Sequence, residues 1–340
     1  MPKRGSKLQN LSVIVTCYNK ITFLPRFFER AEILMKDGAE IVLIDDCSTD
    51  GSSILLERFA KDKCNLKYIA LSTNMGSATA RNTGLQNSSR HFIFFLDIDD
   101  DCDSNNIANV LDACIILDCD LAVGNFIVPP DMTPTSMPLD TDENLITQIE
   151  AVSSNISKSM GYWRYIYRQS FVKAFSIRFF PTRSESHDAK FILDDVFWLL
   201  LLSATKGKLL VTPTNTILYL YNRPEQTKSS WSFYLFQIKQ TPKLCLTFLK
   251  ELKDDSRLRH CDLQKNTFNW LCRSLRILSV KEVFSSGFFS VKYLLSLRKE
   301  TSQGLNLFEY CRGVFQVVLF SVKNSIGIRK RVRALLGTDE

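Results

Sequence analysis

The sequence predicts an α/β fold with a mainly parallel central sheet, followed by a helical C-terminal region. Short apolar segments rich in β-branched residues alternate with amphipathic segments as far as residue 126. Polar residues stand directly after several of these apolar segments. Beyond Arg223 the chain becomes aromatic and basic, with a helical pattern. Strands that alternate with helices are typical of parallel sheets, because a parallel pair needs a long crossover connection.

The expected strands and helices follow one another in a regular order. The first apolar segment, LSVIVTC, is typical of a buried strand, and Pro25 stands near the start of the helix after it. The segment FIFFL is the strongest strand signal, and Ser104 is expected to cap the helix that follows. The expected strands cover residues 11–17, 40–45, 67–71, 92–96 and 120–126, and helices are expected near 25–34, 55–59, 76–85 and 104–117.

Prolines and a change of composition divide the chain. Four prolines between residues 129 and 138 indicate a loop-rich break. The aromatic and basic helical pattern begins after residue 223. We therefore expect three parts: a first half of the α/β domain over residues 8–128, a second half over 129–225, and a basic, mainly helical region over 226–340.

The composition argues against a disordered, a secreted or a membrane-spanning protein. Hydrophobic residues make up 45% and charged residues 23% of the 340 residues, which is typical of a globular chain. No apolar segment near the N-terminus resembles a signal peptide, and apolar runs such as 196–202 and 314–322 are too short to span a bilayer. None of the ten cysteines forms a CxxC pair. We expect a cytoplasmic protein, soluble or peripheral to a membrane, with buried thiols and metal chemistry that depends on carboxylates.

The charge is unevenly distributed. From Thr205 to Glu340, 23 Lys and Arg stand against 10 Asp and Glu, although the whole chain has a net charge of only +7. The first 204 residues are therefore acidic overall. This division suggests a carboxylate-rich site in the first part and a surface that faces anions in the second.

Polar residues follow four of the predicted strands. In open α/β sheets, ligands bind beyond the carboxyl ends of parallel strands, and those ends lie at one edge of the sheet. We therefore expect the four polar positions to converge on a ligand site. They are Tyr18-Asn19, Asp45-Asp46, Asn74 and Asp97, each at the end of its own strand.

The run FFLDIDDDCD carries the strongest chemical signal. Asp97 and Asp99 stand at the end of an apolar strand, where two close carboxylates repel each other unless a cation lies between them. Mg²⁺ or Mn²⁺ accepts oxygen ligands and keeps positions for phosphate oxygens. A metal held in this way can neutralise a diphosphate leaving group.

Other interpretations of this run remain. A calcium loop is excluded, because Cys102 stands where the sharp-turn glycine belongs and Ala108 where the closing glutamate belongs. An aspartate-based phosphotransferase fits the strand end, although Asp101 stands where that family has Thr or Val. A plain acidic loop without a ligand is the third interpretation.

Two further segments are ambiguous taken singly. DDCSTDG has the composition of a turn, but behind a strand its Asp45 is also suited to accept hydrogen bonds from a base or a ribose. In NMGSATARNTG, Arg81 is a candidate for contact with a phosphate or with a carboxylate of the metal site. No GxGxxG segment follows the first strand, so a nicotinamide-binding interpretation lacks its phosphate loop.

Taken in order, SVIVTCYN, IVLIDDCSTDGS, NMGSATARNTG and FIFFLDIDDD resemble glycosyltransferase family 2, whose members are inverting enzymes with the GT-A fold. The resemblance covers about the first 125 residues. It implies that Asp45 contacts the base and that Tyr18, Asn74 and Arg81 help to hold the nucleotide sugar. It also implies that Asp97 and Asp99 form the family's DXD motif. In that motif Asp99 is the direct metal ligand.

The resemblance continues more loosely into the second part. ILDDVFWLL occupies the place of the family's Glu-Asp pair at the head of a helix, with Asp194 in place of the glutamate, so that Asp195 is the implied catalytic base. A carboxylate at a helix start suits a base, which takes the proton of the acceptor hydroxyl, and it equally suits a helix cap. Arg223 and Lys228 fall in a segment that resembles the loop that the family places over the donor. The alternative interpretation of this segment is a solvated loop.

Aromatic residues in GYWRYIYRQSF have two interpretations as well. Trp163, Tyr165 and Tyr167 are suited to stacking on an acceptor sugar, but a place in the core is the favoured interpretation. The basic helices at the C-terminal end are suited to an anionic membrane surface or to packing within a helical bundle. No recognised nucleic-acid-binding module is present, so no nucleic acid partner is expected.

The resemblance implies an inverting, Mn²⁺- or Mg²⁺-dependent transfer of a hexosyl or N-acetylhexosaminyl group. The implied donor is a nucleotide-diphosphate sugar, by family habit a UDP-sugar, and the implied acceptor is a glycan or lipid-linked glycan of bacterial polysaccharide biosynthesis. Two alternatives remain from other classes. One is the aspartate-based phosphotransferase, and the other is a non-catalytic scaffold that binds a membrane or a partner through its basic helices.

Overall fold

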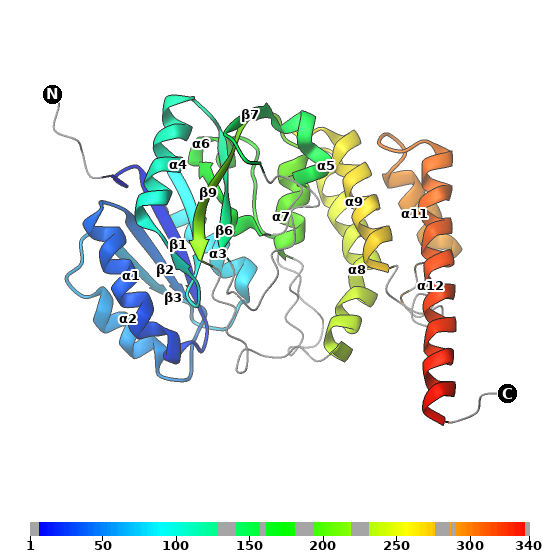
Figure 1. The fold of residues 1–340 in the computed structure, drawn as a ribbon, viewed down its shortest axis with the longest axis horizontal. Coiled ribbons are helices and arrows are strands. Elements are labelled where there is room, and N and C mark those ends of the chain that lie inside the picture. The colour runs from blue at the N-terminus through cyan, green and yellow to red at the C-terminus, as the bar shows by residue number, and fades with distance from the viewer. Residues whose placement is uncertain are drawn as a thin grey trace. The chain divides into compact units, whose positions relative to one another are not determined.

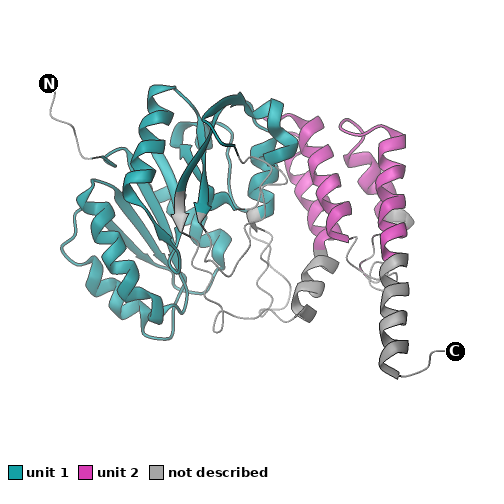
Figure 2. Cartoon of the chain, viewed as in Figure 1, with its two compact units in different colours: residues 1–224 teal, residues 225–340 magenta. Residues whose placement is uncertain are grey.

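The computed structural model describes residues 7–127, 141–156, 161–180, 194–218, 231–275, 286, 288 and 290–336. The chain divides into two compact units, residues 1–224 and residues 225–340 (Figure 2). Each unit has its own secondary structure, so each is described by itself.

The first part of unit 1 alternates strands and helices as predicted. Its four strands pair in parallel in the order β3-β2-β1-β4. Each connection between successive strands contains a helix, which is the crossover that parallel pairing requires. The elements are β1 Leu11–Cys17, η1 Ile21–Phe23, α1 Leu24–Lys36, β2 Glu40–Asp45, α2 Ser52–Ala60, β3 Leu66–Ala70, α3 Ser77–Asn87 and β4 Phe92–Asp97 (Figure 1).

The second part of unit 1 extends the same sheet with mixed pairing. The elements are β5 Asp101–Cys102, α4 Ser104–Ile116, β6 Leu121–Ile127, β7 Leu145–Gln148, η2 Ile149–Val152, α5 Ser153–Ile156, η3 Tyr162–Arg164, β8 Tyr165–Arg168, α6 Gln169–Ala174, α7 Asp194–Ser203 and β9 Lys208–Leu218. Within the described residues the sheet runs β3-β2-β1-β4-β8-β6-β9-β5, and β7 also pairs with β9.

The predicted α/β fold with a helical C-terminal region is confirmed, and the sheet is more mixed than expected. β8 lies between β4 and β6 and is antiparallel to both. Parallel pairing returns between β6 and β9, whereas β5 and β7 are antiparallel to β9. The parallel character therefore belongs mainly to β1–β4, where helical crossovers connect the strands.

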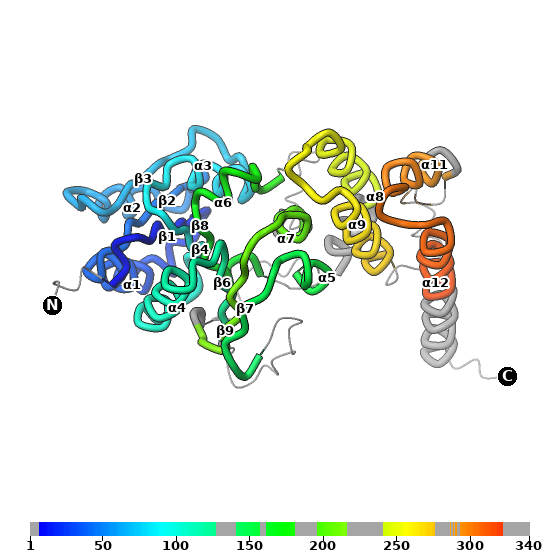
Figure 3. Tube along the Cα trace, turned by 90° about the horizontal axis from the view of Figure 1, so that it is seen from above, coloured from blue at the N-terminus to red at the C-terminus, as the bar shows by residue number. Residues whose placement is uncertain are grey.

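Alternating side chains of the central strands pack against helices on opposite faces of the sheet. Val13 and Val15 of β1 belong to a buried cluster that includes Phe27 of α1 and Leu111 of α4. Ile14 points to the opposite face, and a β-carbon at Gly84 of α3 would lie 2.3 Å from its Cγ2 atom. Only glycine permits this approach of α3 to β1. Figure 3 shows α1 and α4 on one face of the sheet and α3 and α6 on the other.

Unit 2 is made of helices that pack on one another. They are α8 Trp231–Leu252, α9 His260–Leu275, α11 Val291–Glu300 and α12 Leu307–Leu336. Phe268 of α9 stacks on Tyr310 of α12, with ring centroids 5.1 Å apart. A β-carbon at Gly313 would lie 2.5 Å from the Phe268 ring, so glycine lets α12 approach α9 closely.

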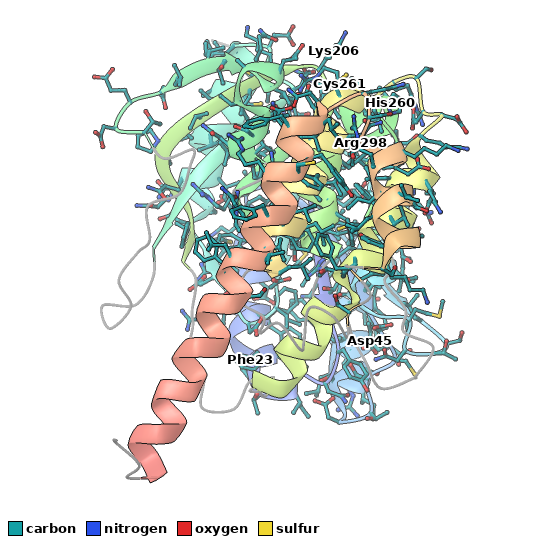
Figure 4. The ribbon with its side chains drawn as sticks, turned by 90° about the vertical axis from the view of Figure 1, so that its right-hand side faces the viewer. Phe23, Asp45, Lys206, His260, Cys261 and Arg298 are labelled. Atoms are coloured by element: carbon teal, nitrogen blue, oxygen red, sulfur yellow. The ribbon has the colours of Figure 1, made fainter. Side chains whose placement is uncertain are left out.

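Arg298 connects the end of α11 to the start of α12. Its Nη1 donates a hydrogen bond of 2.8 Å to the carbonyl oxygen of Leu305. Arg298 lies at the same end of unit 2 as His260 and Cys261, which begin α9 (Figure 4). In the described part of the chain, none of the helices combines the length and the apolar composition needed to cross a membrane.

Candidate functional site

The carboxyl ends of the parallel strands form one edge of the sheet, and polar loops leave from it. The register pairs Cys17 of β1 with Asp45 of β2 and pairs Thr16 of β1 with Asp97 of β4. Asp45 is paired in turn with Ala70, the last residue of β3. The four strands thus end in one row, and the predicted polar positions follow them at this edge, which we call the rim.

The loop after β1 is tied to the loop after β2. The backbone N–H of Asn19 donates to Ser48 Oγ at 2.9 Å, and the Asn19 side chain accepts from the N–H of Thr49 at 2.8 Å. The N–H of Lys20 donates to Ser52 Oγ at 3.2 Å. Asn19 has φ of +51°, a left-handed conformation that asparagine tolerates better than most residues. These contacts determine where the Lys20 side chain leaves the backbone.

Asp45 organises the loop that follows β2. It is fully buried, and its carboxylate accepts hydrogen bonds from the N–H and Oγ of Ser48 at 3.1 and 2.6 Å, and also from Ser53 Oγ. Tyr68 donates to it at 3.4 Å, and burial, together with the Asp45 charge, raises the pKa of Tyr68 to about 12. The expected contact between Asp45 and the base stays a prediction, and its observed contacts are within the protein.

Asp46, the second member of the Asp45-Asp46 pair expected after the second strand, connects the loop after β2 to the start of α3. Its carboxylate accepts from the N–H of Met75 at 2.6 Å and of Gly76 at 2.8 Å. Gly76 has φ of +85°, which favours glycine. Asn74, one residue earlier, is exposed, and Tyr18 is half-buried. The sequence placed Asp46 beside Asp45 at the strand end, but its contacts with Met75 and Gly76 join segments about 30 residues apart and are not encoded locally.

Arg81 of α3 reaches Asp97, the last residue of β4. Its guanidinium lies 3.5 Å from Asp97 Oδ1 and packs over the rings of Tyr162 at 4.4 Å and Phe179 at 5.3 Å. Tyr162 also donates a hydrogen bond of 3.1 Å to the same oxygen. Of the two contacts that the sequence suggested for Arg81, a phosphate or a carboxylate, the structure contains the carboxylate contact.

Asp99 has a different cationic partner. Its Oδ2 atom lies 2.7 Å from Lys20 Nζ, and the two side chains are 15% and 28% exposed, respectively. The N–H of Asp100 donates to the carbonyl oxygen of Asp97 at 3.0 Å, which closes a turn between the two carboxylates. Lys20 was not among the predicted site residues. Its position just after a strand end was the only signal in the sequence.

The remaining acidic residues of the run have structural contacts. Asp101 pairs with Arg26 at 2.8 Å and with Arg30, both on α1. Burial acts to raise the pKa of Asp101, but the hydrogen bonds from Arg26, from the N–H of Cys102 and from Arg30 outweigh it, so that the pKa is lowered. Asp101 is therefore held away from a shared cation site.

The N-cap of α4 is Asp103 and not Ser104. The Asp103 carboxylate accepts hydrogen bonds from the N–H groups of Asn105 at 2.8 Å and Asn106 at 3.0 Å. The prediction of Ser104 as the cap is wrong by one residue. Both residue types are good caps, so the choice depends on the backbone conformation, which is extended at Asp103.

The donor set around Asp97 and Asp99 suits a hard divalent cation that binds together with a diphosphate. Carboxylate oxygens are the ligands that Mg²⁺ and Mn²⁺ prefer. Among the residues that the structure describes, no three His, Cys, Asp or Glu side chains gather around a common point. A cation at Asp99 and Asp97 would thus take its other ligands from phosphate oxygens or water, which is how Mg²⁺ is usually held at phosphate sites.

An aromatic cluster lies beneath Asp97 and anchors α7. Trp198 of α7 stacks on Phe179 with centroids 4.3 Å apart and lies 5.5 Å from the ring of Phe95, two residues before Asp97 on β4. Its Nε1–H donates a hydrogen bond of 3.0 Å to Tyr167 Oη. The cluster consists of five aromatic side chains: Phe95, Tyr162, Tyr167, Phe179 and Trp198.

The predicted base stands at the head of α7. This helix begins at Asp194, so Asp195 is its second residue and precedes Trp198 by less than one turn. The expectation that the Asp194-Asp195 pair begins a helix is confirmed. The side chains of Asp194 and Asp195 lie outside the described ones, so the role of Asp195 stays a prediction.

The aromatic strand β8 belongs to the core. Tyr165 and Tyr167 are fully buried, which confirms the core interpretation for both. Trp163 is half-buried and packs edge-on against Phe126, with centroids 5.2 Å apart. Arg223 and Lys228 lie outside the described residues.

The chain leaves β9 next to the acidic run. The antiparallel pairing of β5 with β9 places Leu218, the last residue of β9, opposite Asp101. The run that holds Asp97 and Asp99 and the C-terminal end of β9 are therefore neighbours in the sheet.

Comparison with solved structures shows the fold. S. aureus TarS 1–349 in complex with UDP-GlcNAc matches with a TM-score of 0.61 and 16% identity, over 94% of this chain and 92% of that one. The complex of the same TarS fragment with UDP matches with a TM-score of 0.56 and 14% identity, over 94% and 91% of the two chains. The predicted GT-A fold is thereby confirmed.

Curated relatives with sequence similarity are glycosyltransferases and polysaccharide-biosynthesis proteins of bacteria. The putative teichuronic acid biosynthesis glycosyltransferase TuaG of Bacillus subtilis is 26% identical over 147 residues, which are 43% of this chain and 58% of TuaG. The succinoglycan biosynthesis protein ExoO of Rhizobium meliloti is 25% identical over 228 residues, 64% of this chain and 62% of ExoO. Glycosyltransferase GlyA of Streptococcus pneumoniae is 31% identical over 116 residues, 34% of this chain and 16% of GlyA. The chain thus spans less than two thirds of each of these relatives.

The family model for glycosyl transferase family 2 matches residues 12–185, half of the chain. The matched segment contains β1 to β4, the acidic run and most of the aromatic cluster. These are the elements that build the rim. This chain belongs to glycosyltransferase family 2.

Proposed function

We propose that this protein transfers a sugar from a nucleotide-diphosphate donor to a hydroxyl group of a glycan, by a single displacement with inversion. The observation that carries the proposal is the pair of carboxylates at the end of β4, each held by its own cation at the rim. Arg81 lies beside Asp97 and Lys20 beside Asp99. Alternating carboxylates and cations suit a diphosphate that binds together with a metal ion.

A UDP-sugar is the proposed donor, and a hexosyl or N-acetylhexosaminyl group is the proposed transferred group. Family membership and the UDP-GlcNAc complex of a protein with the same fold support this choice. The base would lie against the loops after β1 and β2, with Tyr18 and Asp45 as its proposed contacts. Exposed Asn74 and the guanidinium of Arg81 would hold the sugar diphosphate.

Asp99, supported by Asp97, would hold the proposed Mg²⁺ or Mn²⁺ ion. When bound, such an ion supplies positive charge that stabilises the departing diphosphate. The protein's own contribution on this side is orientation. The Tyr162 hydroxyl and Arg81 hold the Asp97 carboxylate, and the aromatic cluster holds Tyr162 and Arg81.

Asp195 is the proposed general base. Its place in the first turn of α7 favours the charged carboxylate, which can accept a proton. The acceptor oxygen would attack the anomeric carbon as its proton passes to Asp195, while the bond from that carbon to the diphosphate breaks on the opposite side. Attack opposite the leaving group inverts the configuration. Trp198 supports this role by fixing α7 against β4.

Each of the three parts of the chain has its own proposed role. Residues 8–128 would form the donor-binding half, 129–225 the acceptor half with the base, and 226–340 a helical region. The relatives named for teichuronic acid and succinoglycan biosynthesis support a glycan or lipid-linked glycan acceptor, modified at the cytoplasmic face of a membrane. Exposed Phe308 and Phe315 of α12 support contact of this region with an anionic membrane surface.

Calorimetric binding of UDP, GDP and dTDP, with and without Mn²⁺, tests the donor site. We expect one nucleotide to bind in the presence of Mn²⁺ and binding to be lost in Asp99→Ala. A wild-type protein that binds none of the three under any metal condition would contradict the proposal. An aspartate-based phosphotransferase would then be tested by trapping Asp97 with a phosphate-mimicking fluoride.

A further inference from the structure

We propose that Lys20 is a built-in counterion that pairs with Asp99 while the donor site is empty and moves to the diphosphate when a metal-bound donor enters. This inference rests on the proposed function and extends it. It assigns to Lys20 two alternative partners in one reaction cycle. The metal ion and the Lys20 ammonium would compete for the same carboxylate.

The first argument is the geometry of the pair. Lys20 Nζ lies 2.7 Å from Asp99 Oδ2, and neither side chain is more than 28% exposed. A charge-assisted contact of this length in a partly desolvated site is stronger than an exposed ion pair. The Lys20 ammonium thus places one positive charge at Asp99, where the proposed metal ion would place two. A divalent ion can bind Asp99 directly only after the ammonium has moved.

The second argument is that the carboxylates of Asp97 and Asp101 have fixed partners. Arg81 packs on the rings of Tyr162 and Phe179, so its guanidinium is held in place beside Asp97. Asp101 is paired with two arginines of α1. The partner of Asp99, by contrast, is a lysine on a flexible four-carbon stem. Of these pairs, the one at Asp99 is best suited to exchange its cation.

The third argument is that the origin of the Lys20 side chain is fixed. Its backbone N–H is bound to Ser52, and the preceding residue, Asn19, is bound to Ser48 and Thr49. The Nζ atom lies 5.1 Å from the centroid of the Phe23 ring, over an aromatic face that favours a cation. The ammonium therefore moves about a fixed point on the rim, and a diphosphate bound through Asp99 would be within its reach.

Calorimetry on the full chain tests both halves of the proposal. The first titration is Mn²⁺ alone, and the second is UDP at saturating Mn²⁺. We expect Lys20→Met to bind Mn²⁺ alone about 5- to 10-fold more tightly, because the competing charge is gone, and to bind UDP about 10-fold more weakly. Lys20→Arg, which keeps a charge at Asp99, should retain a Mn²⁺ affinity near that of the wild type.

Lys67→Met is the matched control, because Lys67 is exposed and donates to Asn87 at the amino end of β3, away from the rim. Both of its affinities should equal those of the wild type, and unchanged thermal melting would show that Lys20→Met is folded. Equal Mn²⁺ affinities of Lys20→Met and the wild type would overturn the competition. Tighter Mn²⁺ binding with unchanged UDP binding would overturn the move to the diphosphate.

Failure of the proposed function has a different signature. In that case the wild type itself would bind no nucleotide, and the second half of the inference would be overturned with it. The titration with Mn²⁺ alone would still decide the competition at Asp99. The two failures are therefore distinguishable in one set of measurements.

Discussion

Asp97 and Asp99 are separated by one residue, and they contact different cations from different elements. Arg81 comes from α3, and Lys20 comes from the loop after β1. Asp101, two residues further, contacts α1. Neighbouring carboxylates in this run therefore hold different elements of the fold, and substitutions at them should affect binding and stability differently. The same distinction applies to Asp45 and Asp46, which hold different loops.

Asp195→Asn is expected to remove turnover and to spare donor binding. The amide cannot accept the proton of the acceptor hydroxyl, so the rate should fall by roughly 10²- to 10⁴-fold. Affinity for UDP with Mn²⁺, measured by calorimetry, should stay within about twofold of the wild type, because the proposed donor contacts lie at the rim and do not include Asp195. A fully active Asp195→Asn enzyme would rule out this residue as the base.

Asp101→Asn is expected to lower the free energy of unfolding by about 2 kcal/mol at neutral pH, because it removes the buried charged partner of Arg30 and of Arg26, whose own contribution is reduced by its solvent exposure. The folded-state pKa of Asp101 lies below its ordinary value of about 3.9. Its contribution is therefore complete above that value and is lost as the pH falls through the folded-state pKa.

Urea unfolding measured from pH 7 down to the acid limit checks this dependence. The difference between the wild type and Asp101→Asn should shrink as the pH falls below about 4. Asp112→Asn on the exposed side of α4 is the control and should change stability by less than about 0.5 kcal/mol. A difference that stays constant down to the acid limit would exclude the ionised Asp101 as its source.

At the scale of the element, the positions of helices and strands along the chain depend on local sequence. The order of the strands in the sheet depends on contacts between distant segments. α1 begins next to Pro25, as expected from the sequence, because proline is favoured in the first turn. β1, β2 and β4 lie where the apolar segments predicted them. The antiparallel insertion of β8 was not predictable, since it depends on which distant strand edge is available.

Asp103→Ala is expected to destabilise the protein by about 1 kcal/mol, through loss of the two hydrogen bonds at the start of α4. Ser104→Ala should cost less, because the Ser104 side chain is not the cap. Thermal or urea unfolding of the two variants compares them directly. If Ser104→Ala were the more damaging change, the assignment of Asp103 as the N-cap would be wrong.

At the scale of the whole molecule, the chain combines an acidic rim in unit 1 with a basic helical unit 2. Leu307, Phe308 and Phe315 of α12 are all more than 60% exposed. The sequence of α12 continues into a stretch, residues 322–336, that has five Lys or Arg and no acidic residue. An exposed apolar surface followed by basic residues is typical of segments that bind anionic lipid surfaces.

Phe308→Ser combined with Phe315→Ser is expected to reduce binding to vesicles that contain anionic phospholipid by at least about 10-fold, from the loss of two aromatic contacts. Cosedimentation with anionic and with neutral vesicles measures the effect. Calorimetric UDP binding should be unchanged and serves as the control for folding. Wild-type protein that fails to bind anionic vesicles, or a double variant that binds them equally, would contradict the membrane proposal.

Local residue patterns were enough to predict the first strands and the acidic run. Alternating apolar segments specified the strands and their order along the chain, and the acidic run after FIFFL located the rim at the end of β4. These features depend on contacts within a few residues, or on the general rule that parallel strands end at one edge. Asp97, Asp99 and Arg81 were therefore recognisable before the fold was known.

Only the tertiary structure decided which cation pairs with which carboxylate. Lys20 and Asp99 are 79 residues apart, and Arg26 and Asp101 are 75 residues apart. Such pairs depend on the register of β1 against β4 and on how α1 packs on the sheet, which local patterns do not encode. The same reason applies to Asp45, whose burial and internal hydrogen bonds follow from the packing of α2 and β3. Long-range packing, more than local residue preference, thus sets the electrostatics of the site.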